Sequence, residues 1–236
     1  MNATSREGSD IAPRAELVEI RRGIAVLFRP GDVIEVRIPK ASRYGVISGY
    51  FDDFEKLANA LHQADCQYRP PGVYYTVNPC LPALLGRAYN RLRERAELTT
   101  ADSDIAFRRW LPIDLDPVRP AGISSSDDEH EASLARARLI RCELANEGWR
   151  SPVLSDSGNG AHLLYELDLP NTPDGLRTVL GLLALVSERF SDERVKVDTT
   201  SGNAARIWKA YGTVSRKGDS IPVRPHRCSR ILEACE

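Results

Sequence analysis

The chain has 236 residues, of which 42% are hydrophobic, and this is enough for a well-filled core in one large domain or in two packed modules. Composition therefore excludes a disordered or fibrous protein. A formal net charge of -1 does not by itself indicate a nucleic-acid partner. The charge is unevenly distributed, however, because seven basic side chains and one acid lie between positions 203 and 230. This segment predicts a local positive surface.

Two features indicate the compartment. The five cysteines are scattered and form no CxxC pair, which argues against a disulfide framework and favours a reducing environment. Residues 1–14 are polar and lack the apolar core of a signal peptide, and no stretch has the roughly 18 apolar residues of a spanning helix. We expect a flexible N-terminal arm over 1–14 on a soluble, cytoplasmic protein without a membrane partner.

The first half predicts alternating strands and helices. Apolar runs at 25–28 and 33–38 flank a Pro-Gly-Asp turn and predict a β-hairpin. A strand over 44–48, a helix over 52–64 and a strand over 73–77 follow. Asn78 and Pro79 have the residue types of a helix start, and they predict a helix that continues to about 97.

The second half predicts a sheet with helices on one face. A strand over 110–116 stops at Pro117, and Ser126 with Glu129 forms a capping box that opens a helix to about 147. Strands over 152–154 and 161–167 are joined by an Asn-Gly turn, which is a strong hairpin signal. A helix over 176–190 and strands over 195–198 and 205–211 complete an α+β fold with an antiparallel or mixed sheet.

An acid-x-acid pattern closes the first of these strands. Asp114 and Asp116 are two residues apart, so both carboxylates project from one face of a strand and suit a divalent cation. For an isolated pattern of this kind, solvation of a strand end is the more common explanation. Asp102 and Asp104 have the same spacing, but no apolar strand precedes them, and we assign them a turn or capping role.

The turn after the capped helix has the composition of a phosphate site. Ser157, Gly158, Asn159 and Gly160 can bring backbone N–H groups close to an anion, and His162 can bind a phosphate oxygen. A plain hairpin is the alternative. Further on, Asp198 closes a short strand and could complete a three-carboxylate metal site. Arg206, Lys209 and Lys217 could neutralise a triphosphate, although strand alternation places Arg206 and Lys209 on opposite faces unless the strand bends.

The three segments in this order resemble the archaeo-eukaryotic primase superfamily, in particular the primase-polymerases of phages, plasmids and other mobile elements. The family signature is an acid-x-acid strand, a Ser-Gly-x-Gly-x-His turn and a later acid followed by basic residues. Here these elements correspond to Asp114 with Asp116, to residues 157–162, and to Asp198 with Arg206. The resemblance extends to residues 49–52, 74–79 and 224–227 and covers nearly everything after the N-terminal arm.

The resemblance implies a catalytic domain over 15–236, with an N-terminal α/β module (about 15–106) packed on a module that resembles an RNA-recognition motif (about 107–236). It implies template-directed addition of NTPs or dNTPs on single-stranded DNA, as a DNA primase or polymerase in replication. Two Mg²⁺ or Mn²⁺ ions would be held by Asp114, Asp116 and Asp198. The triphosphate would be bound by Ser157, His162, Arg206, Lys209 and Lys217.

Many relatives also carry a zinc module and a helicase domain. The sequence has no four-ligand zinc pattern, and His226, Cys228 and Cys235 do not form one. We expect unwinding to come from a helicase on a separate chain. Two other functions stay open: a non-catalytic module that binds single-stranded nucleic acid, and a metal-dependent nuclease, because two-metal sites also cut phosphodiesters.

Overall fold

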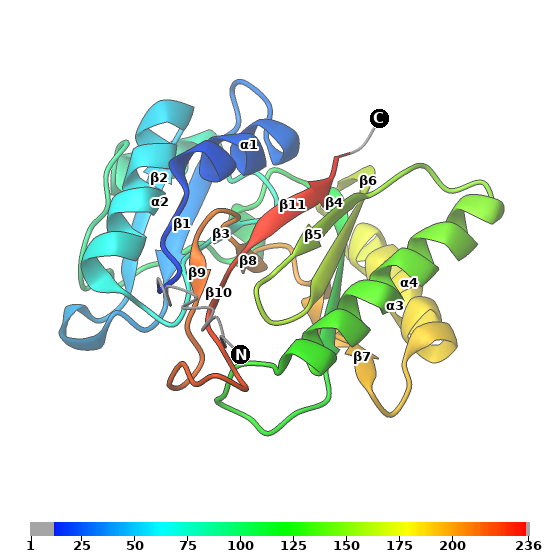
Figure 1. The fold of residues 1–236 in the computed structure, drawn as a ribbon. Coiled ribbons are helices and arrows are strands. Elements are labelled where there is room, and N and C mark those ends of the chain that lie inside the picture. The colour runs from blue at the N-terminus through cyan, green and yellow to red at the C-terminus, as the bar shows by residue number, and fades with distance from the viewer. Residues whose placement is uncertain (1–11, 235–236) are drawn as a thin grey trace, which may run out of the picture.

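The computed structural model describes residues 12–234, and the N-terminal arm therefore lies almost wholly outside the described residues. The fold is α+β, as predicted, and all pairs of named strands within it are antiparallel (Figure 1). The α-helices are α1 Leu17–Leu27, α2 Phe54–Tyr68, α3 Asp127–Asn146 and α4 Pro173–Phe190. The strands are β1 Ile34–Ile38, β2 Ile47–Phe51, β3 Tyr74–Thr76, β4 Phe107–Pro117, β5 Val153–Asp156, β6 Ala161–Pro170, β7 Val195–Val197, β8 Ile207–Lys209, β9 Val214–Ser215, β10 Arg227–Cys228 and β11 Arg230–Glu233.

The N-terminal module is a four-stranded sheet in the order β2-β1-β3-β8, with α1 and α2 packed beside it. The predicted hairpin over 25–38 is wrong, because its first half belongs to α1. Ile20, Ile24 and Leu27 are spaced three and four residues apart and form one buried helical face. The Pro-Gly-Asp turn therefore connects a helix to β1, where Asp32 accepts a hydrogen bond from the Arg29 backbone N–H at 2.7 Å.

The predicted helix from Pro79 to about 97 is also wrong. Only a 3₁₀ turn, η2 Pro82–Arg87, forms there, and the segment after it runs along the edge of β2. Gly49 makes this close approach possible, since a Cβ at that position would lie 2.0 Å from the Arg91 carbonyl oxygen. Asn78 does not cap a helix, because its side-chain oxygen accepts from the Arg109 backbone N–H. The second acid-x-acid pattern forms a 3₁₀ turn, η3 Asp102–Asp104, which agrees with its assigned role.

The C-terminal module is a five-stranded sheet in the order β11-β5-β6-β4-β7. Helices α3 and α4 cover one face, with Leu111 and Leu163 among the residues buried beneath them. The other face packs on the N-terminal module, because Trp110 and Leu164 belong to the same buried cluster as Ile24 and the β8 residue Trp208. From Trp110 onward, alternation along β4 therefore turns odd-numbered residues toward the helices and even-numbered residues toward the other module.

Two further observations concern the whole chain. Strand β8 comes from the second half of the sequence but pairs with β3 in the N-terminal sheet, and so the modules are interleaved along the chain. The division into about 15–106 and 107–236 stays a prediction. Within residues 12–234, each helix is too short or too polar to cross a membrane.

Candidate active site

Three carboxylates meet where the five-stranded sheet faces the N-terminal module. Asp114 and Asp116 have even numbers on β4 and therefore share the inner face with Trp110. Strand β7 pairs with the end of β4, and the Asp198 backbone N–H donates to the Asp114 carbonyl oxygen at 2.9 Å. All three acids line one pocket of about 170 Å³. The structure thus brings together the acids that lie more than 80 residues apart in the sequence.

The surroundings of the two β4 acids shift their pKa values in opposite directions. Burial and the neighbouring Asp114 charge raise the pKa of Asp116. Burial acts on Asp114 in the same direction, but the nearby His162 imidazole and the charges of Lys217 and Arg206 outweigh it and lower the pKa of Asp114. Two carboxylates that repel each other in this way would be stabilised by a bound cation.

His162 is buried, and the Nδ1 side of its ring contacts a network of hydroxyl groups. Its Nδ1 lies 2.9 Å from the Tyr211 hydroxyl, which accepts from Trp208 Nε1 at 2.9 Å and from Ser155 Oγ at 2.5 Å. Because two donors already point at this oxygen, the Tyr211 proton is directed to Nδ1. The other ring nitrogen, Nε2, lies 3.5 Å from Asp114 Oδ1. In this conformation His162 orients a carboxylate, and its contact with a nucleotide stays a prediction.

Both oxygens of Asp198 are already occupied. Oδ1 accepts from the backbone N–H and the hydroxyl of Thr200, at 2.8 and 2.7 Å, and Oδ2 accepts from Arg206 Nη2 at 2.8 Å. A second arginine, Arg119, lies 3.4 Å from Asp116 Oδ1. The arginine predicted to bind phosphate is therefore paired here with the acid predicted to bind metal.

The acids can be compared with the needs of a divalent cation. Across residues 12–234, no three His, Cys, Asp or Glu side chains are grouped so that they could hold an ion by themselves. Mg²⁺ does not need such a group, because it commonly takes one or two carboxylates together with water and substrate phosphates. Asp114 and Asp116 supply that oxygen donor set. Burial raises the pKa of Asp116, and so does the negative charge of Asp114, which an ion would neutralise. The pair fits one hard cation, whereas a second ion would need Asp198 to leave Arg206.

The glycine turn between β5 and β6 forms the predicted hairpin but does not present free amides. The Gly158 N–H donates to the Asp156 carboxylate at 2.6 Å, and the Gly160 N–H donates to Ser157 Oγ at 3.0 Å. The predicted nest of backbone donors is therefore already satisfied within the turn. The side chains remain available, since Ser157 and Asn159 both line the carboxylate pocket. Among the described residues, the buried Asn159 Nδ2 has no hydrogen-bond partner.

Three cations complete the pocket wall, namely Arg206, Lys209 and Lys217. The predicted conflict between Arg206 and Lys209 does not arise, because β8 begins only at Ile207 and alternation does not extend to Arg206. Lys209 is buried, and its Nζ donates to Thr213 Oγ1 at 2.7 Å and to the Val214 carbonyl at 3.0 Å. These two acceptors hold Lys209 at the pocket wall.

The predicted positive surface is smaller than the sequence suggests. Of the seven basic residues between 203 and 230, four arginines form ion pairs. In three of these pairs the acid lies far away in the sequence. The pairs are Arg206–Asp198, Arg216–Asp65, Arg224–Glu129 and Arg227–Asp127. Much of this segment therefore stabilises the fold and offers little charge to a partner.

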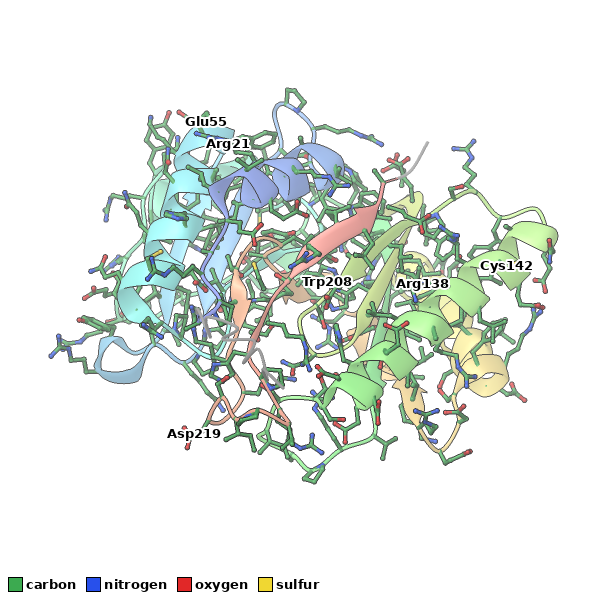
Figure 2. All side chains as sticks on the ribbon, viewed as in Figure 1. Arg21, Glu55, Arg138, Cys142, Trp208 and Asp219 are labelled. Atoms are coloured by element: carbon green, nitrogen blue, oxygen red, sulfur yellow. The ribbon has the colours of Figure 1, made fainter. Side chains whose placement is uncertain are left out.

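Sequence reasoning missed several residues of the site. Tyr211 holds His162, Arg119 lies beside Asp116, and Tyr74 lines the pocket from β3. Burial, helped by the charges of Asp114 and Asp116, raises the pKa of the Tyr74 hydroxyl. Trp208, labelled in Figure 2, lies between the modules with its ring centroid 4.1 Å from that of His162. The sequence signal that could have identified these residues is the presence of aromatic side chains, Tyr74, Trp208 and Tyr211, close to the predicted site motifs.

Comparison with known proteins gives two solved structures with a similar fold. The primase RepB' aligns over 92% of this chain and 56% of its own, with a TM-score of 0.46 and 12% identity. The polymerase domain of Mycobacterium tuberculosis Ligase D, solved in complex with DNA, aligns over 89% of this chain and 79% of its own, with a TM-score of 0.47 and 18% identity. This chain thus spans little more than half of RepB'. No protein-family model and no curated protein matches it. At such values the likeness does not assign an activity to this chain.

Proposed function

We propose that this chain is a nucleotidyltransferase of the primase-polymerase kind, which adds NTPs or dNTPs to a 3′-hydroxyl on a single-stranded DNA template. The observation that carries the proposal is the meeting of opposite charges in one pocket between the modules. Asp114, Asp116 and Asp198 enter it from the five-stranded sheet. Arg206 and Lys209 enter it from the start and end of β8, which belongs to the other sheet.

Metal binding is part of the proposal. Asp114 and Asp116 would hold a first Mg²⁺ or Mn²⁺ ion, and Asp198 would serve a second ion once Arg206 pairs with the triphosphate. Two bound ions supply charge stabilisation for the attacking hydroxyl and for the phosphates. His162 would orient Asp114, whose Oδ1 lies 3.5 Å from its Nε2.

The cationic wall suits the triphosphate. Arg206 has the bidentate geometry that phosphates favour, and Lys209 and Lys217 add charge in a partly enclosed pocket where it acts strongly. The buried Asn159 amide is a neutral donor beside them. Ser157 adds a hydroxyl at the same wall.

The test is nucleotide incorporation on primed and unprimed single-stranded DNA with Mg²⁺ or Mn²⁺. Asp114→Asn, Asp116→Asn and Asp198→Asn should each abolish incorporation, because an amide supplies neither the charge nor the second oxygen ligand. Asp174→Asn is the matched control, since this acid is exposed at the start of α4. Template cleavage without incorporation would identify a nuclease. DNA binding without either reaction, unchanged in all variants, would identify a non-catalytic module.

A further inference from the structure

The outer face of α4 is apolar although it faces solvent. Leu185 is 64% exposed and Leu180 is 41% exposed, and Gly181 and Ala184 between them are exposed as well. These residues include two pairs at a spacing of four, so they share one side of the helix. A surface helix normally carries charged or polar residues on that side. Because Leu185 also lines a groove of about 480 Å³ beside α3, the apolar surface is continuous and indicates an interaction site.

Two opposite charges close this face at its ends. Arg177 lies one turn before Gly181, Glu188 lies one turn after Ala184, and both are exposed. Glu188 is eleven residues after Arg177, or about 16 Å along the helix axis, so the two cannot pair within one chain. The contact of Arg177 with Asp174 is an exposed i,i+3 pair, which stabilises little and leaves Arg177 free to change partner.

The composition of the face is symmetric about its centre, which lies between positions 182 and 183. The residues at equal distances from this centre are Leu180 and Leu185, Gly181 and Ala184, and Arg177 and Glu188. If an identical helix packs antiparallel across the face, Arg177 of each copy meets Glu188 of the other. A twofold axis produces this kind of isologous contact. We propose that the outer face of α4 binds α4 of a second copy of this chain, so that the protein is a homodimer.

The same symmetry places large residues against small ones. In the antiparallel pair Leu185 lies over Gly181 of the second copy, and Leu180 lies beside Ala184 of the second copy. A Cβ at Gly181 would meet nothing within 4 Å in the single chain, so the space above it is open to the leucine of the second copy. Small residues at the crossing point let the two helix axes approach closely, which increases the apolar area that is buried.

The dimer leaves the candidate active site open. Helix α4 packs on the face of the five-stranded sheet that buries Leu111, whereas Asp114 and Asp116 lie on the opposite face (Figure 1). The two pockets would therefore point away from the twofold axis. The inference does not depend on the proposed function. One helix pair buries less than the roughly 1,200–2,000 Å² of a standard interface, so we expect a weak dimer with a Kd on the order of 10 µM.

Sedimentation velocity of the full chain between about 1 and 100 µM tests the inference. Leu185→Glu places a charge at the centre of the interface. Leu98→Glu is the matched control, because Leu98 is 67% exposed and belongs to the N-terminal module. The charge reversals Arg177→Glu and Glu188→Arg are measured singly and as an equimolar mixture, since only the mixture restores opposite charges at both symmetry-related contacts.

We expect wild type and Leu98→Glu to dimerise alike and Leu185→Glu to stay monomeric. Each charge reversal alone should weaken association by at least about fivefold, because both contacts then join like charges, and the mixture should regain wild-type association. A variant that fails to fold could not be rescued by mixing, so the rescue reports the contact itself. A wild type that stays monomeric, a dimer that Leu185→Glu leaves intact or that Leu98→Glu disrupts equally, or a mixture that associates no more tightly than the single variants would overturn the inference.

Discussion

Lys209 offers a quantitative test of how the pocket is built. The residue is 5% exposed, and burial lowers the pKa of its ammonium from 10.5 to about 7, against the opposing charge of Asp65 and with smaller contributions from Arg216 and Lys217. The unfolded chain therefore holds the proton more tightly than the folded chain. It follows that this group makes the free energy of unfolding rise with pH from about 7 to about 10.

The size of this effect can be worked out for an accessible range. Between pH 7 and 8.5 an unfolded lysine stays protonated, whereas Lys209 in the folded protein goes from half protonated to nearly neutral. Integration at 1.36 kcal/mol per proton and pH unit gives a gain of about 1.6 kcal/mol. Lys209→Met removes this gain, while the other groups titrate in both proteins and largely cancel.

Urea unfolding of wild type and Lys209→Met at the two pH values measures this difference. The free energy of unfolding of the wild type should improve relative to the variant by about 1.6 kcal/mol between pH 7 and 8.5. Lys196→Met, at an exposed position on β7, should give no such change. If wild type and Lys209→Met shift equally with pH, folding does not lower the pKa of Lys209 and the expected difference is refuted.

Three further predictions concern stability and DNA binding. Without metal, Asp116→Asn should leave the melting temperature unchanged or raise it, because the fold raises the pKa of Asp116 and so disfavours its charge at neutral pH. Asp114→Asn should lower the melting temperature, since the fold lowers the pKa of Asp114. Binding of a fluorescent single-stranded oligonucleotide should weaken with salt at a log–log slope of about -1.4. This slope corresponds to Lys217 and Arg230, because four of the seven basic residues are ion-paired and Lys209 is buried; a slope near about -4.9, as for all seven, would contradict the ion pairs described here. Gly49→Ala should destabilise by about 1–3 kcal/mol in chemical unfolding, while Gly86→Ala, where a Cβ meets nothing within 4 Å, should be nearly neutral.

Local signals predicted the C-terminal module well. The capping box is present, with Ser126 accepting from the Glu129 N–H and the Glu129 carboxylate accepting from the Ser126 N–H. The Asn-Gly turn joins β5 to β6, and the acid-x-acid pattern lies on β4. These features depend on residues close in sequence, and so a pattern is enough to recognise them.

The errors arose where distant contacts override local preference. Asn78 and Pro79 have the residue types of a helix start, but the Asn78 amide binds β4 and Ala204, and the following chain pairs with the edge of β2. The hairpin error came from a short apolar run, 25–28, whose period could not distinguish the end of a helix from a strand. Neither outcome could be obtained from neighbouring residues alone.

The charge pattern of the site also depends on contacts between residues that are distant in sequence, and it explains how the pocket forms. Its acids belong to the five-stranded sheet, while Arg206 and Lys209 flank or end β8, which crosses to the sheet of the other module. The pocket therefore exists only when the modules are packed together, and the return of the chain through β8 places cations opposite Asp114 and Asp116. In the linear sequence, Arg216, Arg224 and Arg227 look like a free positive surface. Their partners, which are Asp65, Glu129 and Asp127, lie 95 to 151 residues away. Which cations remain for a ligand is decided by this packing, and it leaves Lys217 beside Asp114 and Asp116, since the Lys217 charge acts on the pKa of both acids.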